Sequence, residues 1–392
     1  MPDRPLRIAL VGPAPPYRGG IAHFLVSTAK RLRERGHAAE VVTFTRQYPE
    51  LLFPGKTQYA EGEPAGDGPQ ARRMLDSVGP RSWWRTARHL RAWEPDMVVF
   101  MQWMPFFAPA FGTVARQVRK DGARVLAVVH NALPHEPRPG DHALMRYFLK
   151  ATDGLVVLSD SVRSDLARLG VDEAQTPVRQ VRHPVYDHFG DALPQAEARR
   201  RLGLPADAPV LLFFGFVRAY KGLDVLLDAM PDVLKRVPEA RLVVAGEFYE
   251  DEATYRERTA ALGTETMGAV RFDADYIPDA EVATYFSAAD VVVQPYRSAT
   301  QSGVAQIAFH FARPVVTTDV GGLAETVPDG EAGLVVPPED PAALAAALVR
   351  FFDDDLAEPL AAGVRRERER YSWDHLLDAL EALAVTPLSP RP

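Results

Sequence analysis

The stretch Val291–Pro314, VVVQPYRSATQSGVAQIAFHFARP, is the part of the sequence that most directly indicates the fold. It opens with three valines, which are typical of a buried parallel strand, and Pro295 ends that strand. A loop of small polar residues follows, and apolar residues then recur at helical spacing from Val304 to Phe311. This order predicts a βα unit whose helix start offers free N–H groups to a phosphate; an ordinary βα turn is the alternative.

The composition is that of a folded protein, with 47% hydrophobic and 25% charged residues in a chain of 392, long enough for two domains. The absence of cysteine excludes disulfides, thiolate metal sites and cysteine nucleophiles. A net charge of −7 argues against a nucleic-acid partner. The apolar run Ile8–Val11 is too short for a signal peptide or a membrane span. We therefore expect a cytoplasmic protein, and peripheral contact with the inner membrane face stays an open alternative.

The N-terminal half alternates strands with helices. Leu6–Val11 is expected to be a buried strand, Ile21–Arg35 a helix and Ala39–Phe44 the next strand, which is how a doubly wound sheet begins. The glycines between the first strand and the helix do not have the G-x-G-x-x-G spacing, so a nicotinamide-dependent enzyme is disfavoured. Further strands are expected at 96–101, 124–129 and 154–158.

Three features of this half suggest function. Residues 46–80 are polar, rich in Gly and Pro and without periodicity, which predicts a long loop of the functional or mobile kind. The segment Trp103–Phe107 is strongly apolar; core packing beneath the sheet is favoured over an apolar lip for an acceptor or a membrane. His130 follows the strand at 124–129, at the edge where parallel sheets bind ligands, so we predict a functional role for it.

The alternation restarts after a segment rich in Ala, Pro and Arg at 192–209. Two successive blocks of this kind predict an α/β protein with two doubly wound Rossmann-like domains facing one cleft. We place the N-terminal domain at 1–195 and the C-terminal domain at 196–371. A last helix at about 372–392 is expected to pack back on the N-terminal domain.

The loop Gly215–Gly222 carries two cations, Arg218 and Lys221, directly before a helix. Two cations beside helix N–H groups would make a diphosphate site, whereas solvated surface charge is the alternative. The sequence contains no H-E-x-x-H motif and no Walker loop, and its histidines show no ligand spacing. We therefore expect a phosphate site that uses no metal and no cofactor.

With these motifs the chain resembles the family 4 retaining glycosyltransferases of the GT-B fold. The similarity covers nearly the whole sequence and is carried by Gly19-Gly20, by His130, by the loop Gly215–Gly222 and, most specifically, by Pro314–Gly333 (PVVTTDVGGLAETVPDGEAG). It implies a nucleotide-diphosphate sugar donor bound mostly by the C-terminal domain. It also implies a hydroxyl acceptor on the N-terminal domain, which would be a glycan, a lipid-linked or a small molecule.

The resemblance also implies roles for individual residues. Lys221 would neutralise the leaving diphosphate, and Arg218 would replace an arginine that the family usually has at the position of Phe216. Retention is usually ascribed in this family to attack from the front face. The implied catalytic residues are His130, Lys221 and Arg218, and the implied donor-phosphate contacts are Gly19, Gly20, Arg218, Lys221, Ser302, Gly303 and Val304. The nucleotide would contact Tyr276, Ile277 and Gln306.

The chain departs from the family at its signature of two glutamates separated by seven residues, because Ala299 and Ile307 occupy those positions. We predict that Thr300 and Gln301 contact the donor sugar instead, since neutral hydroxyls and amides can hydrogen-bond sugar hydroxyls. The expected activity is sugar transfer in polysaccharide, glycolipid or glycoside biosynthesis. The alternatives are a GT-B epimerase or phosphorylase, or a catalytically inactive partner that binds a sugar nucleotide.

Overall fold

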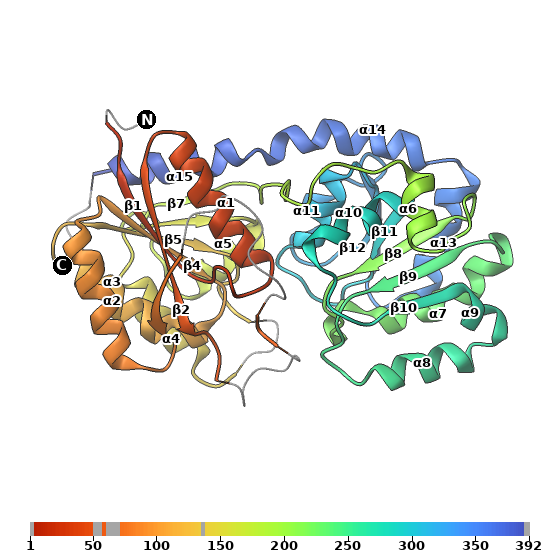
Figure 1. Ribbon diagram of the computed structural model, residues 1–392, viewed down its shortest axis with the longest axis horizontal. Coiled ribbons are helices and arrows are strands. Elements are labelled where there is room, and N and C mark those ends of the chain that lie inside the picture. The colour runs from red at the N-terminus through yellow and green to blue at the C-terminus, as the bar shows by residue number, and fades with distance from the viewer. Residues whose placement is uncertain (1–3, 50–56, 60–70, 135–137, 388–392) are drawn as a thin grey trace. The chain divides into compact units, whose positions relative to one another are not determined.

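The computed structural model describes residues 4–49, 57–59, 71–134 and 138–387. The chain divides into two compact units: residues 1–182 with 373–392 form the first, and residues 183–372 form the second. Each unit is built on one parallel sheet with helices on both of its faces (Figure 1). The predicted α/β class, with two Rossmann-like domains, is confirmed.

The first unit contains a sheet in the order β3-β2-β1-β4-β5-β6-β7. The direction in which strands are added reverses between β1 and β4, and ligands of such sheets bind outside the carboxyl ends of the strands at this point. The strands are β1 (Arg7–Val11), β2 (Ala38–Arg46), β3 (Ala71–Asp76), β4 (Met97–Gln102), β5 (Arg124–Val129), β6 (Gly154–Val157) and β7 (Val178–Gln180).

The helices of the first unit cover both faces of this sheet. In Figure 1, α2, α3 and α4 lie along one face, and α1 and α15 lie on the other. The helices are α1 (Gly20–Glu34), α2 (Pro80–Trp93), the 3₁₀ turn η2 (Pro105–Phe107), α3 (Ala108–Arg119), α4 (Asp141–Leu149), α5 (Asp160–Arg168) and α15 (Trp373–Val385).

The second unit repeats the same winding, in the order β10-β9-β8-β11-β12-β13, with the reversal between β8 and β11. Its strands are β8 (Val210–Phe214), β9 (Arg241–Ala245), β10 (Val270–Asp273), β11 (Val291–Gln294), β12 (Val315–Thr318) and β13 (Gly333–Val336). Its helices are α6 (Gln195–Arg201), η3 (Ala219–Lys221), α7 (Leu223–Arg236), α8 (Glu252–Ala261), α9 (Thr264–Ala269), α10 (Asp279–Ala288), α11 (Gly303–His310), α12 (Leu323–Thr326), α13 (Pro341–Asp353), α14 (Ala357–Arg368) and η4 (Glu369–Tyr371).

The central strands form because their side chains are apolar on both faces. All residues of β4 (MVVFMQ) and of β11 (VVVQ) are buried, as expected for strands covered by helices on both sides of a parallel sheet. Each strand ends in a glutamine, Gln102 or Gln294, which places a buried polar group at the carboxyl edge of its sheet. The loops that follow these strands lie at the same edge, where parallel sheets bind their ligands.

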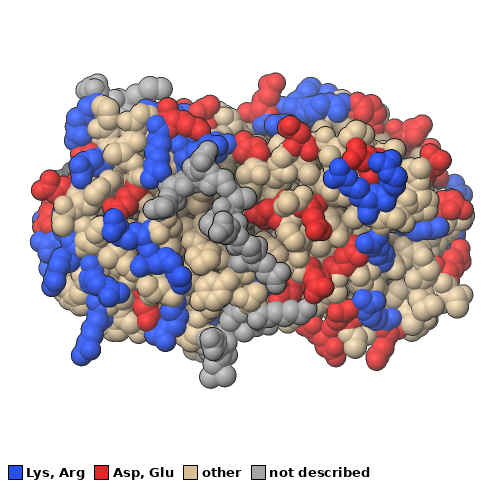
Figure 2. Space-filling view, in the orientation of Figure 1, with Lys and Arg blue, Asp and Glu red and all other residues tan. Residues whose placement is uncertain are grey.

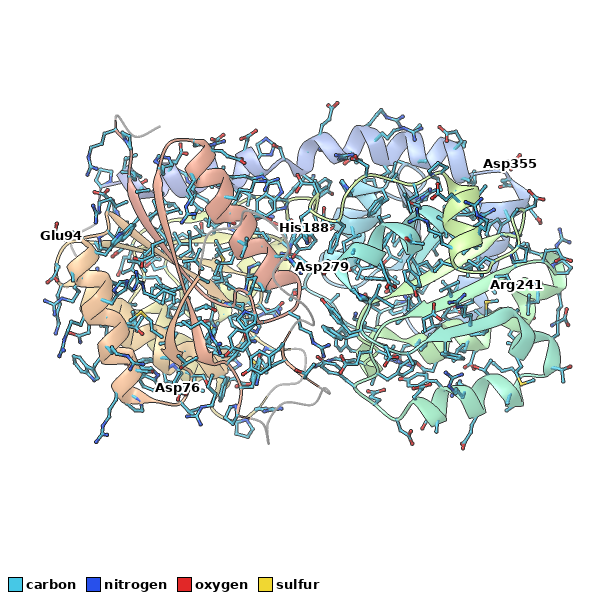
Figure 3. All side chains as sticks on the ribbon, viewed as in Figure 1. Asp76, Glu94, His188, Arg241, Asp279 and Asp355 are labelled. Atoms are coloured by element: carbon cyan, nitrogen blue, oxygen red, sulfur yellow. The ribbon has the colours of Figure 1, made fainter. Side chains whose placement is uncertain are left out.

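The expectation of one irregular segment over residues 46–80 is wrong in part. Ala71–Asp76 forms the edge strand β3, which pairs in parallel with β2. Its sequence ARRMLD does not alternate cleanly, and only Leu75 is fully buried, so pairing with β2 rather than sequence periodicity defines this strand. At the end of β3, Asp76 accepts a hydrogen bond of 2.6 Å from Arg46 on β2 (Figure 3 labels Asp76). The middle of the segment, 50–56 and 60–70, lies outside the described residues.

The interpretation of Trp103–Phe107 as core packing is confirmed for Phe107, which has no exposed surface. The ring centroid of Phe107 lies 4.1 Å from that of Trp103 and 5.3 Å from that of Phe44. Trp103 and Phe106 are partly buried and pack against the same core. Because these rings pack against one another, the apolar residues after β4 form part of the hydrophobic core of the first unit.

The division between the units falls at Arg182/His183 and not at 195/196 as placed from the sequence. The backbone N–H of Val185 donates to the carbonyl of Tyr371, and that of Leu193 donates to Ser287 Oγ, so this segment is bound to the second unit. The last helix, α15, belongs to the first unit, where Arg35 pairs with Asp374 at 2.6 Å. The composition changes at 192–209, whereas the hydrogen bonds of the preceding segment place the boundary between the units at Arg182/His183.

A search of the described residues finds no helix with the length and apolarity needed to cross a membrane.

Candidate functional site

The site in the second unit is built by the loops that follow β8 and β11, the two strands at which the winding reverses. The loop after β8 runs from Gly215 to Gly222, and the loop after β11 runs from Pro295 to Ser302. They touch directly, because the backbone N–H of Arg297 donates to the carbonyl of Tyr220 at 2.7 Å. A Cβ added at Gly222 would lie 2.0 Å from the carbonyl oxygen of Pro295, so only glycine fits at this crossing, with φ at +66°.

Lys221 is the cation at the centre of this loop pair. Its side chain is buried, and its Nζ lies 5.6 Å from the ring centroid of Tyr296. A Cβ built on Gly215 would lie 3.2 Å from this Nζ and 3.5 Å from Cγ2 of Val304. The lysine amine therefore lies close to the first turn of α11, as the phosphate prediction requires.

The surroundings of Lys221 disfavour its charge. Burial and, to a smaller extent, the nearby positive charge of Arg218 together lower its pKa to about 7. Among the residues that the structure describes, its Nζ has neither a hydrogen bond nor an ion pair. A buried amine without a counter-charge is expensive unless a ligand supplies one, and pKa shifts of this kind concentrate at functional sites.

Arg218 lies in an aromatic cluster beside the lysine. Its guanidinium carbon is 4.7 Å from the ring centroid of Tyr249. Phe216 contacts the same ring, with centroids 4.7 Å apart, and its ring centroid lies 6.2 Å from that of Tyr276. The two predicted cations are thus close together, and Tyr276 belongs to the same cluster. Ile277 follows it and is buried.

Ser302 is the N-cap of α11, and its side chain is used in hydrogen bonds within the protein. Ser302 Oγ accepts a hydrogen bond from the backbone N–H of Ala305 at 3.4 Å and another from Gln294 Nε2 at 2.8 Å. The first turn of any helix leaves N–H groups without helical partners, so Gly303 and Val304 can bind an anion through their backbone. The contribution of Ser302 to a phosphate site is therefore its position as N-cap.

Two glutamines of this region carry buried polar atoms that the protein does not satisfy. Gln301 Nε2 and Gln306 Oε1 are inaccessible to solvent and have no hydrogen-bond partner within the described part of the chain. An unsatisfied buried amide costs about 1–3 kcal/mol, so such atoms indicate a group that is satisfied by a ligand. Thr300 is half-buried in the same loop.

The two positions that carry glutamate in the family face packed surroundings. Ala299 and Ile307 each retain 7% exposure, and Ala299 packs with Tyr296 and Leu323. A glutamate at either position would have to displace neighbours. The polar atoms available to a ligand come instead from Gln301 and Gln306, which lie between these two positions in the chain.

The remaining predicted residues lie in the first unit. Gly19 precedes α1 with φ at +112°, and Gly20 is the first residue of that helix. His130 directly follows β5, is mostly buried, and packs edge-on against Phe24 of α1 with ring centroids 4.7 Å apart. The structure therefore brings Gly19, Gly20 and His130 to the start of α1, and gathers the other predicted residues in the second unit.

Two contacts of the site were not foreseen from the sequence. Tyr186 lies directly on the start of α11, because a Cβ added at Gly303 would come within 2.9 Å of Tyr186 Cε2, and the Tyr186 hydroxyl lies 3.5 Å from His183 Nε2. Arg297 contacts the turn that carries Lys221. Tyr186 stands in a short segment without periodicity, and a lone arginine such as Arg297 resembles a surface charge.

Comparison with known families gives two matches along the chain. Residues 18–185 match the family described as Glycosyltransferase Family 4, and residues 208–354 match the family described as Glycosyl transferases group 1. The first match lies almost entirely in the first unit and the second lies within the second unit.

Among the curated relatives, the D-inositol 3-phosphate glycosyltransferase of Nocardioides sp. is 34% identical over 241 residues, which cover 58% of this chain and 52% of that protein. The protein of the same description from Kineococcus radiotolerans is 34% identical over 277 residues, covering 65% of this chain and 62% of its own length. The chain spans about half the length of the curated relatives it matches.

Two solved structures illustrate the similarity in fold. Sucrose-phosphate synthase from Thermosynechococcus elongatus superposes with a TM-score of 0.72 at 22% identity, over 96% of this chain and 97% of that one. Anabaena Alr3699/HepE in complex with UDP superposes with a TM-score of 0.74 at 17% identity, over 97% of this chain and 100% of that one. At these identities the similarity concerns the fold.

Proposed function

We propose that this chain, which belongs to the family 4 glycosyltransferases with the GT-B fold, transfers a sugar from a nucleotide-diphosphate donor to a hydroxyl acceptor with retention of configuration. The observation that carries the proposal is the buried, unpaired amine of Lys221 beside Arg218 and the first turn of α11. A diphosphate supplies the negative charge that this arrangement lacks. Synthesis of a polysaccharide, glycolipid or small glycoside is the proposed setting.

The chemistry follows from where charge develops. The bond between the anomeric carbon and the phosphate oxygen breaks, and its electron pair leaves with the nucleoside diphosphate. Lys221, Arg218 and the N–H groups of α11 stabilise that charge, so the step needs no dedicated metal ion. The loop 295–303 contains no Asp or Glu to serve as a covalent nucleophile, which favours attack of the acceptor hydroxyl from the side of the leaving group.

In such a front-face attack the acceptor oxygen bonds to the anomeric carbon, and its proton passes to an oxygen of the departing phosphate. We assign Thr300 and Gln301 to the hydroxyls of the donor sugar, and Gln306 with Tyr276 and Ile277 to the nucleotide. His130, with Gly19 and Gly20, is assigned to the donor or acceptor from the first unit. The unsatisfied atoms of Gln301 and Gln306 support this assignment.

The proposal is tested by binding followed by turnover. Thermal unfolding is measured with UDP, GDP, ADP and their glucose conjugates, because a ligand that binds only the folded state raises the melting temperature. UDP is the first choice, since a structural relative is known in complex with UDP. Sugar transfer or donor hydrolysis with the stabilising donor, unchanged by EDTA, is the expected result. A protein that binds no nucleotide, or binds one without any turnover, contradicts the proposal.

Donor affinity is expected to fall as the pH rises from 6 to 8. The pKa of Lys221 is about 7, so the free protein loses this positive charge across that range. The probe is UDP-glucose, whose two phosphates are both esterified and do not titrate near neutral pH. The dissociation constant, measured by calorimetry, should rise by up to about tenfold per pH unit above 7, as for any binding that requires one proton. In Lys221→Arg, where the cation stays charged, the dependence should flatten; an equal slope in both proteins would refute it.

Membrane contact is proposed for the exposed face of α2 in the first unit. This unit carries 27 Lys and Arg against 21 Asp and Glu, a net charge of +6, whereas the second carries 18 against 31, a net charge of −13. Figure 2 shows Lys and Arg gathered on the visible face of the first unit. Helix α2 contains no acidic residue, Arg81 and Arg88 are exposed, and Trp84 is 57% exposed. A basic helix face with an exposed Trp fits an anionic bilayer surface.

Vesicle co-sedimentation tests this surface. The protein should bind vesicles that contain phosphatidylglycerol and not vesicles of phosphatidylcholine alone. Each reversed arginine should weaken binding by at least about 1 kcal/mol, so Arg81→Glu with Arg88→Glu should lose most of it. The matched control, Lys235→Glu with Arg350→Glu, reverses two exposed charges of the second unit. Equal loss in both double variants would indicate net charge alone, and no loss would exclude α2.

A further inference from the structure

Lys221 is positioned mainly by its backbone, because its amine makes no hydrogen bond or ion pair with a described residue and lies only over the ring of Tyr296, at 5.6 Å. It is the last residue of the 3₁₀ turn η3, and the position of its amine therefore depends on what fixes this turn. Only Gly222 separates this turn from the start of helix α7. A single glycine does not fix the orientation of the turn, so contacts from other elements must do so.

Arg297, in the loop after β11, makes those contacts. Its backbone N–H donates to the carbonyl of Tyr220 at 2.7 Å, and its Nη1 donates to the carbonyl of Ala219 at 2.7 Å. Both carbonyls belong to η3. The carbonyl of Ala219 also accepts a hydrogen bond from the backbone N–H of Gly222 at 3.1 Å, so the arginine side chain adds a second donor to this carbonyl and its backbone adds a donor to that of Tyr220.

The guanidinium of Arg297 is itself fixed from the other side. Its Nη1 and Nη2 donate to the two carboxylate oxygens of Asp224, in the first turn of α7, at 2.9 and 2.7 Å. Its Nε donates to Glu339, in the loop after β13, at 3.0 Å. The hydrogen bond to Asp224 is the largest cause of a raised pKa for Arg297, so its charge is permanent. A bidentate pair of this kind fixes orientation as well as charge.

A second contact holds the beginning of the same turn. The backbone N–H of Ala219 donates to Glu250 Oε1 at 2.6 Å. The turn is therefore held at its first N–H by Glu250 and at two carbonyls by Arg297. Of the two residues, only Arg297 joins the loops that follow β8 and β11, which are the loops that form the site.

We propose that Arg297 is a positioning residue that holds η3 so that the amine of Lys221 faces the donor diphosphate; this inference rests on the proposed function. Without its side chain the turn loses the link from Ala219 to Asp224 and Glu339 and keeps the backbone contact to Tyr220 and the contact to Glu250, so the lysine amine loses its fixed direction. A displacement of about 1 Å can reduce a rate by about 100-fold, because charge stabilisation depends on orientation. The nucleotide contacts in 276–277 and on α11 do not touch Arg297, so donor affinity should change little.

The experiment is a double-variant cycle in the full-length protein, measured as sugar transfer. Arg297→Met should lower kcat by about 30- to 100-fold while KM for the donor stays within about threefold, and Arg297→Lys should recover part of the loss. In a Lys221→Met background, Arg297→Met should cause almost no further loss, because the group it positions is gone. Arg236→Met is the matched control: it removes an ion pair between α7 and Asp353, far along the helix from η3, and should leave kcat unchanged.

Each other outcome is decisive. If the losses from Lys221→Met and Arg297→Met multiply, or if KM rises as much as kcat falls, Arg297 is only structural and the inference is overturned while the proposed function stands. If the wild-type protein transfers no sugar from any donor, the proposed function fails and the inference fails with it. Melting temperatures of all variants are measured alongside; should Arg297→Met not fold, Arg297→Lys and its double variant with Lys221→Met give the same cycle.

Discussion

Lys221→Met should reduce sugar transfer by at least about 100-fold and, at the same time, stabilise the free protein. The loss is expected because the amine lies at the start of α11, where the charge of the leaving diphosphate develops, and removing one such donor typically costs 10²–10³ in rate. The gain is expected because methionine fills similar space without a buried charge. Initial rates with a saturating donor and the melting temperature measure the two effects. A natural site under selection for activity often carries such a cost in stability.

The stabilisation should depend on pH in a defined direction. The pKa of Lys221 is about 7 in the folded protein, against about 10.4 for an unperturbed lysine. Below pH 7 both folded and unfolded chains carry the proton, and the folded chain bears the full cost of burying the charge. Between pH 7 and about 10 only the unfolded chain keeps the proton, so the wild-type protein gains stability as the pH rises.

The advantage of Lys221→Met in denaturant unfolding should therefore be largest at pH 6 and smaller at pH 9. A difference that does not change between these two values would mean that the amine is solvated in the free protein. Near-normal turnover by Lys221→Met would remove this residue from the catalytic site. Lys235→Met, on the exposed part of α7, is the control, since its amine lies 2.6 Å from Asp232 and is not buried.

Gly321→Ala should destabilise the protein by more than about 3 kcal/mol and abolish nucleotide binding. Gly321 lies in the loop after β12 with φ at +50°, a conformation that costs a residue with a Cβ about 1–2 kcal/mol. The larger effect is steric, because the added Cβ would lie 1.6 Å from the carbonyl oxygen of Ala299. That carbonyl belongs to the loop that carries Thr300 and Gln301, so the loop must move for the methyl group to fit. Denaturant unfolding and the thermal shift with UDP measure the two effects.

Gly330→Ala separates the steric effect from the conformational one. Gly330 also has a positive φ, +72°, but no described atom lies within 4 Å of a Cβ added there. This variant should lose only about 1–2 kcal/mol and keep its nucleotide binding. If Gly321→Ala lowers the free energy of unfolding no more than Gly330→Ala does, the close approach of Gly321 to Ala299 does not order the loop after β11.

Several parts of this protein could be predicted from the sequence because the signal was local. Runs of β-branched residues such as Val291–Val293 predict buried parallel strands wherever they occur, since both faces of such strands are covered. The helix start at Gly303 and the two cations before Gly222 were recognisable from residue type and order alone. Ser302 was expected at this start as a phosphate contact, and its role as N-cap appeared only in the structure.

Other parts had no local signal. β3 is an edge strand with charged side chains, and only its pairing with β2 makes it a strand. The unit boundary at Arg182/His183 depends on contacts of the following segment with residues more than a hundred positions away, such as Tyr371. A change of composition in the sequence does not report such contacts.

The sequence by itself determined the central strands, the parallel character of the sheets and the residues that follow those strands. The tertiary structure alone decided which of those residues meet. Lys221 and Val304 are neighbours because β8 and β11 are adjacent in the sheet, and Arg297 reaches η3 for the same reason. Strand order is set by how whole helices and strands pack over long separations in the chain, whereas periodicity reports only neighbours within a few residues. The burial that lowers the pKa of Lys221 arises from that packing and exists only in the folded chain.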